Sequence, residues 1–322
     1  MCGRTACTLE PEAMCKACQY KDSAGKHASA RWQAEETGDG RGYCSSYNLA
    51  PTDVIPCVVA GRHFRAEEER VLHPMVWGMI PRWHKGDYRK HGMSTHNARF
   101  EGLSASKLYS HPLSLGQRCV IVCDGYYEWK TTKQTSKGSK QPYFIYAKQD
   151  EGVKIEDRQT WNKEWSQDDG WNGIKLLKIA GIFDTWLSAE NKKIYSCSMI
   201  TTSANEILSW LHHRIPMFLE SDEEVADWLD YENVPLRDAL KKLHGPTTDS
   251  LKWHPVDPMV NNSRFKSISC YQPIVIEEKK EKVLQSGLMT SWLKTGSMKS
   301  VKNKSEIDAF DDKSDIKRLK SE

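Results

Sequence analysis

The sequence has 322 residues, of which 39% are hydrophobic, enough for one large or two small globular domains with a substantial core. Its formal net charge of +3 is only mildly basic, so overall charge neither requires nor excludes nucleic acid as a partner. The sequence contains no run of about 18 apolar residues, and its charged start lacks the apolar core of a signal peptide. We therefore expect neither a membrane span nor secretion.

The chain contains ten cysteines, which raises the question of disulfides or zinc. Without a signal peptide we expect a reducing compartment, which disfavours disulfides. Cys15 and Cys18 form a C-x-x-C pair, but no second pair exists to complete a zinc site, so zinc is the weaker alternative. Cys119 and Cys123 lie in an apolar segment and are expected to be small buried side chains. We predict no metal and no cofactor.

The first residue with distinctive chemistry is Cys2. Removal of Met1 would leave Cys2 with a free α-amine beside its thiol. An α-amine has a reference pKa of about 7.7 to 8.0, so part of it is neutral at physiological pH. A neutral amine forms a Schiff base with an aldehyde, and the adjacent thiol can close onto it as a thiazolidine. Many chains begin Met-Cys, so this start alone does not establish a function.

Two polar and aromatic segments follow. Residues 47–52, which include Asn48 and Pro51, predict a polar turn with a bend fixed by proline. Residues 77–83 combine two indoles with an arginine, end at Trp83, and precede a run of basic residues. Such a stretch is typical of a surface that follows phosphates and stacks bases. A solvated loop with core tryptophans is an equal alternative.

Two further segments carry candidate polar groups. Asn97 and Arg99 would share one face if the chain is extended there. Glu128 lies among aromatic residues after an apolar strand, where burial would raise its pKa towards the range useful for proton transfer. A structural glutamate in a salt bridge is the alternative reading.

Short segments rich in β-branched and aromatic residues predict a mixed or antiparallel sheet. These segments are residues 71–80, 119–123, 143–147, 176–183 and 195–202. Capping boxes at Ser203 with Glu206 and at Ser221 with Glu224 predict two helices, and a third is expected after Pro235. Strands and helices do not alternate regularly, which makes a doubly wound parallel sheet improbable.

His212 and Arg214 would end the first of these helices. An imidazole there can act as an acid or base, and Arg214 can face a phosphate. Two cations that simply complement a helix C-terminus fit the sequence equally well.

Beyond the globular part the composition becomes polar and charged. We expect a domain over residues 1–272 and a disordered tail over residues 273–322. In the tail, Gln285, Leu288 and Trp292 are spaced like a sliding-clamp-binding peptide, although a chance cluster explains them as well. A basic cluster at residues 317–320 is compatible with a nuclear protein.

Taken together, these segments resemble the SRAP (SOS-response-associated peptidase) family, and in particular its vertebrate members. The matching segments, in the family's order, are residues 1–4, 47–52, 77–83, 97–99, 125–129, 180–186 and 212–216. The resemblance implies a single α+β domain with a curved, barrel-like, mostly antiparallel sheet flanked by helices. One departure is His84, which stands where bacterial members tend to have a second tryptophan.

The resemblance also implies a function: covalent crosslinking to abasic sites in single-stranded DNA, which would shield the lesion at replication forks in the nucleus. Cys2 would form the thiazolidine, and Asn97 would hold the nucleophile and the sugar. Glu128 would shuttle protons, and His212 would assist opening of the sugar ring. The residues implied to contact DNA are Arg4, Asn48, Pro51, Trp83, Arg99 and Arg214, with Pro51 and Trp83 acting as a wedge.

Two other functions remain open at this stage. One is a cysteine peptidase that removes its own first residue. The other is a non-catalytic reader of modified cytosine, which would use the same basic cleft without the Cys2 thiol. We expect a monomer.

Overall fold

The computed structural model describes residues 2–33, 40–131 and 140–276. A compact unit ends at Ile276. It extends past residue 272, because the Ile274 N–H donates to the Pro255 carbonyl at 3.0 Å. The predicted tail from residue 277 onward lies outside the described residues, as do the basic cluster at 317–320 and the clamp-like group of Gln285, Leu288 and Trp292.

The larger sheet closes on itself. Five of its strands form a ring in the order β7-β6-β9-β14-β15, and β15 pairs back with β7 in parallel. These strands are β6 (Val54–Ala60), β7 (Arg70–Trp77), β9 (Arg118–Cys123), β14 (Leu177–Leu187) and β15 (Lys193–Ser203). Three short strands extend the ring: β4 (Arg31–Trp32), β8 (Asn97–Arg99) and β16 (Arg214–Pro216). β6 and β7 are buried along their whole length, as expected for strands covered on both faces.

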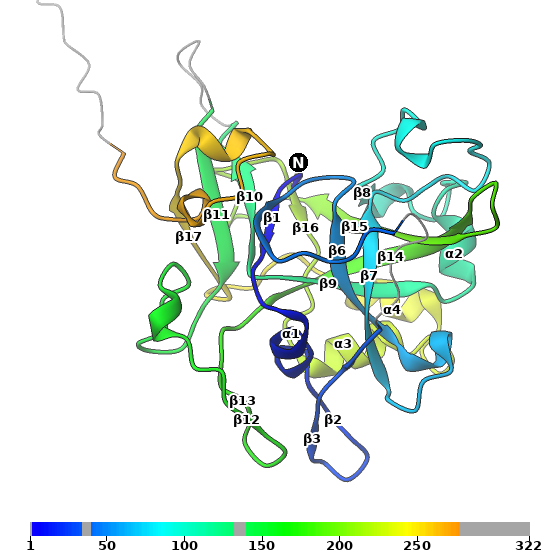
Figure 1. The fold of residues 1–322 in the computed structure, drawn as a ribbon, viewed down its shortest axis with the longest axis horizontal. Helices are drawn as coiled ribbons and strands as arrows, with labels where there is room; N and C mark the ends of the chain where they lie inside the picture. Colours follow the sequence, from blue (N-terminus) through cyan, green and yellow to red (C-terminus); the bar gives the residue numbers. More distant parts are fainter. Residues whose placement is uncertain (1, 34–39, 132–139, 277–322) are drawn as a thin grey trace, which may run out of the picture. The chain divides into compact units, whose positions relative to one another are not determined.

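A second, antiparallel sheet contains the N-terminal strand β1 (Figure 1). Its order is β17-β11-β10-β1-β5. The bounds are β1 (Thr5–Cys7), β5 (Ser46–Leu49), β10 (Gly125–Trp129), β11 (Pro142–Ala147) and β17 (Leu251–Pro255). Two small hairpins complete the strands: β2 (Tyr20–Lys21) with β3 (His27–Ala28), and β12 (Trp165–Ser166) with β13 (Gly170–Trp171).

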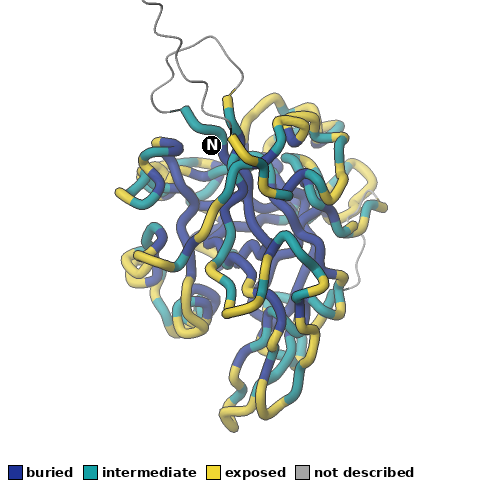
Figure 2. Tube along the Cα trace, turned by 90° about the vertical axis from the view of Figure 1, so that its left-hand side faces the viewer, coloured by how far each residue is buried: buried dark blue, intermediate teal, exposed yellow. Residues whose placement is uncertain are grey.

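Helices are few and short. They are α1 (Pro11–Ala17), α2 (Ser110–Ser114), α3 (Asp222–Leu229) and α4 (Leu236–Lys242). Single 3₁₀ turns are η1 (Gly61–Phe64), η2 (Tyr88–Lys90), η3 (Phe100–Gly102), η4 (Arg158–Thr160), η5 (Pro258–Asn261) and η6 (Ile268–Cys270). Figure 2 shows buried residues along the central strands and exposed residues in the outer loops. No helix in the described ranges is both long and apolar enough to cross a bilayer.

The predicted α+β fold with a barrel-like sheet is confirmed, and all five predicted strands are present. The capping box at Ser221 is also confirmed, since its hydroxyl accepts from the Glu224 N–H at 3.1 Å. The helix predicted after Pro235 forms as α4.

The helix predicted after Ser203 is wrong. Ser203 is the last residue of β15 and pairs with Arg214 in β16. Asn205 then donates to the Pro246 carbonyl at 2.8 Å, and the Ala204 N–H donates to the His213 carbonyl at 3.0 Å. Strand pairing and these long-range bonds hold the segment as a series of turns, so the local capping signal does not decide its structure.

Candidate functional site

Cys2 lies just before β1 and is only 2% exposed. Its carbonyl accepts a hydrogen bond from Asn97 Nδ2 at 2.8 Å, and its Sγ lies 3.9 Å from Met199 Sδ. β8 and β15 pair in parallel with Asn97 opposite Met199, so one strand register positions both contacts. Burial raises the pKa of the Cys2 thiol well above its usual value, and the nearby Glu128 carboxylate raises it further. The thiol is therefore protonated at neutral pH.

Asn97 and Arg99 share a face of β8, as predicted, because Ala98 between them is fully buried. The Asn97 side chain offers a second group to the site. Its Oδ1 is buried, and no described residue supplies it with a hydrogen-bond partner. A buried carbonyl oxygen of this kind is ready to accept from an amine or a hydroxyl.

Glu128 lies on β10 and is 3% exposed. Thr5 of β1 pairs with Tyr126, and the Tyr127 N–H donates to the Arg4 carbonyl at 3.0 Å. This register continues towards Cys2 and brings Glu128 opposite the start of the chain. Burial raises the pKa of the Glu128 carboxyl, as the sequence predicted, so the protonated form is favoured more than in an exposed glutamate.

His212 is 5% exposed and lies in the turn before β16. It does not end a helix, so the reading of a cation at a helix C-terminus is wrong. Its Nδ1 faces the Arg214 N–H at 3.0 Å, which leaves the proton of the neutral ring on Nε2. Burial lowers the pKa of His212 to about 4, so the ring is neutral at pH 7.

Glu128 and His212 thus have pKa values shifted in opposite directions, a pattern typical of an acid and base pair. The Lys140 ammonium lowers the pKa of both groups, which shows that both side chains lie near the same charge. Four distant segments supply the site residues Cys2, Asn97, Glu128 and His212. Asn97 and Glu128 both act on Cys2, and His212 is related to Glu128 through Lys140.

The three predicted phosphate contacts differ in availability. Arg99 is exposed at the end of β8. Arg4 is half-buried, and its guanidinium donates to the Gly3 and Asn261 carbonyls at 2.9 and 3.3 Å. Arg214 is buried and engaged in a bidentate pair with Glu101 at 2.7 and 3.0 Å. Arg99 is thus the most accessible of the three cations.

Asn48 and Pro51 occupy the same turn but have different roles in the fold. The Asn48 side chain is fully buried and donates to three carbonyls, those of Val260, Asn262 and Phe265, at 2.9 to 3.1 Å. Its amide nitrogen therefore fastens the turn to the segment after β17, and full burial closes the side chain to solvent. Pro51 is half-buried and borders a small cavity of about 50 Å³.

Trp83 is 55% exposed, and the loop that carries it is firmly anchored. Arg82 donates two hydrogen bonds to the Asp184 carboxylate at 2.6 and 2.7 Å, and Asp184 is only 2% exposed. The Trp186 indole donates to the His84 carbonyl at 3.1 Å. Asp184 and Trp186, both within residues 180–186, therefore anchor the Trp83 loop on β14.

Sequence reasoning missed several residues of this region. Met199 contacts the Cys2 thiol, Asp184 anchors the Trp83 loop, and Lys140 lowers the pKa of both Glu128 and His212. His96 directly precedes Asn97 and has its pKa lowered to about 4 by burial. Only the adjacency of His96 to Asn97 was a signal visible in the sequence.

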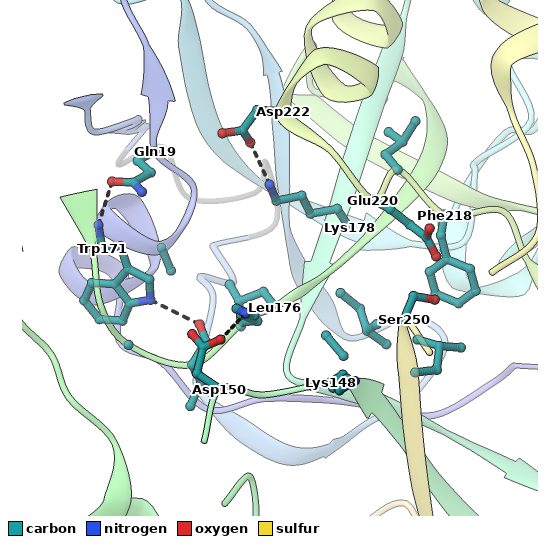
Figure 3. A pocket seen from close by; sticks show the side chains of 18 residues that line it. Gln19, Lys148, Asp150, Trp171, Leu176, Lys178, Phe218, Glu220, Asp222 and Ser250 are labelled. Carbon is teal, nitrogen blue, oxygen red and sulfur yellow. Dashed lines mark hydrogen bonds and ion pairs between the residues drawn. The ribbon is translucent and has the colours of Figure 1, made fainter. Parts of the chain in front are cut away.

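A cavity of about 470 Å³ lies elsewhere, between the end of α1, the start of β14 and residues 218–222 (Figure 3). None of the predicted site residues lines it. Lys178 in its wall is paired with Asp222 at 2.7 Å, and Lys175 is paired with Asp150. Across the described ranges, no group of three or more His, Cys, Asp or Glu side chains is arranged to hold a metal ion.

Comparison with known proteins places the chain among related sequences. It is 38% identical over 306 residues to the abasic site processing protein HMCES of Xenopus tropicalis, covering 93% of this chain and 87% of that protein. The HMCES of Gallus gallus is 36% identical over 313 residues, covering 95% and 88%. The abasic site processing protein YoqW of Bacillus subtilis is 30% identical over 227 residues, covering 70% and 84%.

Solved structures share the fold. A protein from Bordetella bronchiseptica matches with a TM-score of 0.56 at 20% identity, covering 80% of this chain and 100% of that chain. A protein from Bacteroides thetaiotaomicron matches with a TM-score of 0.53 at 20% identity, covering 71% and 86%. The family described as SOS response associated peptidase (SRAP) matches residues 1–263. This chain therefore belongs to the SRAP family.

Proposed function

We propose that this chain captures abasic sites in single-stranded DNA through a thiazolidine between Cys2, exposed by loss of Met1, and the ring-opened sugar. The observation that carries the proposal is the Asn97 amide bonded to the Cys2 carbonyl at 2.8 Å, beside a buried glutamate that acts on the Cys2 thiol. The three relatives described above are named for abasic-site processing, which supports the same substrate.

Each step has a group suited to it. Glu128 protonates the ring oxygen as the sugar opens to its aldehyde, and the Cys2 amine attacks C1′. Loss of water gives the Schiff base, and Glu128 and the neutral His212 relay the protons. The thiol then adds to the imine carbon while its proton passes to the nitrogen. One water is released, and no oxidant or reductant is needed.

The surroundings fit a single strand of DNA. Arg99 and Arg4 offer cationic contacts to phosphates, and the exposed Trp83 with Pro51 can separate bases that flank the lesion. A single strand also avoids the few kcal/mol needed to unpair a duplex. We place this activity in the nucleus at replication forks, with the chain acting as a monomer that shields the lesion.

The test mixes purified protein lacking Met1 with an oligonucleotide bearing one abasic site, beside a Cys2→Ala variant. We expect a band shift that survives denaturation, without borohydride, only when Cys2 is present. A tetrahydrofuran analogue, which cannot open to an aldehyde, is the matched DNA control and should give no shift. Equal and fully reversible binding by both proteins would reject the covalent mechanism and favour a reader of modified bases.

The family name includes a peptidase, and one such activity would be removal of Met1 by the chain itself. Mass spectrometry of a Glu128→Gln variant separates self-processing from removal of Met1 by another enzyme. Self-processing predicts that this variant retains Met1, whereas removal by a cellular aminopeptidase leaves it processed like the wild type.

A further inference from the structure

Four residues form a group on the sheet that carries Glu128: Lys130, Tyr143, Trp210 and Trp253, hereafter the aromatic–lysine strip. In this antiparallel sheet Glu128 lies opposite Tyr143, while Tyr126 lies opposite Ile145 and Ile145 opposite Trp253. Directly paired residues and residues two apart share a face. Glu128, Tyr143 and Trp253 therefore project from the same face of the sheet.

Trp210 joins these residues from the loop before His212. Its ring lies 5.0 Å from the Tyr143 ring, edge to face, and 5.7 Å from the Trp253 ring. The Lys130 ammonium lies 5.5 Å from the Trp210 ring centroid, in the geometry of a cation–π contact. Trp253 is 38% exposed, so an aromatic surface remains accessible beside the lysine.

The strip is continuous with the candidate site. Lys130 follows Glu128 by two residues, and its N–H donates to the Gln141 carbonyl at 2.9 Å. The Thr131 N–H donates to the Leu211 carbonyl at 2.9 Å, directly before His212. The exposed Lys140, whose charge acts on both Glu128 and His212, adds a second cation at this junction.

The strip and Trp83 belong to different sheets. The Trp83 loop is fixed to β14 of the ring through Asp184, whereas the strip lies on β10, β11 and β17. Figure 1 shows β10, β11 and β17 on one side of the N-terminus and β8 and β15 on the other. A strand crossing Cys2 from the Trp83 side would therefore leave the site over the strip.

We propose that the aromatic–lysine strip is a second stacking platform, which binds nucleotides of the single strand on the side of the lesion away from Trp83. Accessible indole beside ammonium groups suits bases and phosphates together, and it needs no particular sequence. A purely structural cluster would account for the half-buried Tyr143 and Trp210. It gives no reason for the Trp253 indole to stay 38% exposed on the edge strand β17. The proposal rests on the function proposed above.

The test measures binding of wild-type protein, Trp253→Ala and Lys130→Gln to oligonucleotides that carry the tetrahydrofuran analogue. One set extends only 5′ of the analogue, a second extends only 3′, and a third extends on both sides. Fluorescence anisotropy gives the affinity. Trp253→Phe keeps an aromatic ring, and Lys241→Gln on α4 is a charge-matched control remote from the strip.

We expect Trp253→Ala to weaken binding about fivefold or more for one of the two one-sided sets of oligonucleotides, the set whose extension reaches the strip. Binding of the other one-sided set should not change. Trp253→Phe should restore most of the affinity, and Lys130→Gln should reduce the dependence of binding on salt. Equal affinities for all variants on every oligonucleotide would overturn the inference, as would an equal loss on both sides.

Crosslinking to a true abasic site is measured in parallel. If the strip variants bind like the wild type while wild-type protein still crosslinks, the inference fails and the proposed function stands. If the wild-type protein never crosslinks, but Trp253→Ala binds more weakly than the wild type to oligonucleotides extended on one side, the platform stands and the thiazolidine chemistry fails. If Trp253→Ala has a changed melting temperature, Lys130→Gln decides the question: a salt dependence of binding equal to that of the wild type then overturns the inference.

Discussion

Asn97 holds the backbone of Cys2, the nucleophile of the proposed mechanism. Its Nδ2 holds the Cys2 carbonyl at 2.8 Å, so loss of this bond frees the backbone that carries the amine. A hydrogen bond of this kind is worth about 0.5–1.5 kcal/mol net, so we expect Asn97→Ala to slow single-turnover crosslinking about two- to tenfold. Asn97→Asp should be slower still, because a carboxylate would face the carbonyl. Equal rates for Asn97→Ala, Asn97→Asp and the exposed control Asn233→Ala would contradict this role.

The buried Glu128 carboxyl makes a prediction about pH. Burial raises its pKa, and in the proposed mechanism its protonated form is the acid in ring opening, so the crosslinking rate should fall as pH rises through that pKa. Glu128→Gln keeps the shape without the proton, and we expect a loss of about 10²- to 10⁴-fold together with loss of that limb of the profile. Affinity for uncleaved single strands should change little. A Glu128→Gln variant with the wild-type pH profile would show that another group supplies the proton.

At the scale of elements, the loop of Trp83 depends on a strand far away in sequence. Arg82→Met removes both bonds to Asp184 and leaves a carboxylate that is 2% exposed without this partner. We expect a loss of about 1–3 kcal/mol in the free energy of unfolding, measured by urea titration, together with weaker binding of single-stranded DNA. The matched variant Trp83→Ala should weaken DNA binding without lowering stability, since its indole is exposed. If Arg82→Met binds DNA normally despite its lower stability, the loop is not positioned by Asp184.

Elements also show where local patterns fail. The box at Ser221 forms its helix because Glu224 and Ser221 bond to each other's backbone and α3 packs its apolar side on the ring. The equivalent pattern at Ser203 is overridden because Ser203 completes the pairing of β15 with β16. Strand pairing satisfies the same backbone groups that a helix would use, and it also buries Ile215. The local sequence cannot distinguish the two outcomes.

At the scale of the whole molecule, two histidines link stability to pH: His212 is buried and His96 is half-buried. The pKa values of His96 and His212 are both lowered by burial, from an ordinary 6.5 to about 4. Between these values the unfolded chain binds protons that the folded chain does not, so their contribution to stability is lost as pH falls from about 6.5 to about 4. Asp124 and Glu128, whose pKa values are raised, act in the opposite direction.

The comparison of variants isolates the histidine contribution. We expect the urea midpoint to fall less in His212→Asn than in the wild type when the pH is lowered from 7 to 5. The reason is that the variant has no imidazole at this position to protonate. The exposed His111→Asn, on the outside of α2, serves as control and should follow the wild type. Parallel loss in the wild type and in His212→Asn would show that the ring is not neutral in the folded state.

The sequence by itself determined the β-rich composition of the fold, the positions of five strands, the helix after Ser221 and the residues that carry the family resemblance. These features are local, because alternation, capping and motif order are read from neighbouring residues. Only the tertiary structure decided that β15 closes the ring onto β7 and that Asn97 meets Cys2, 95 residues away. It also decided that Asp184 holds the Trp83 loop and that the Asn48 amide nitrogen is bonded to backbone carbonyls inside the protein. The physical reason is that these contacts depend on strand register and burial, which the whole chain sets together and no local stretch encodes.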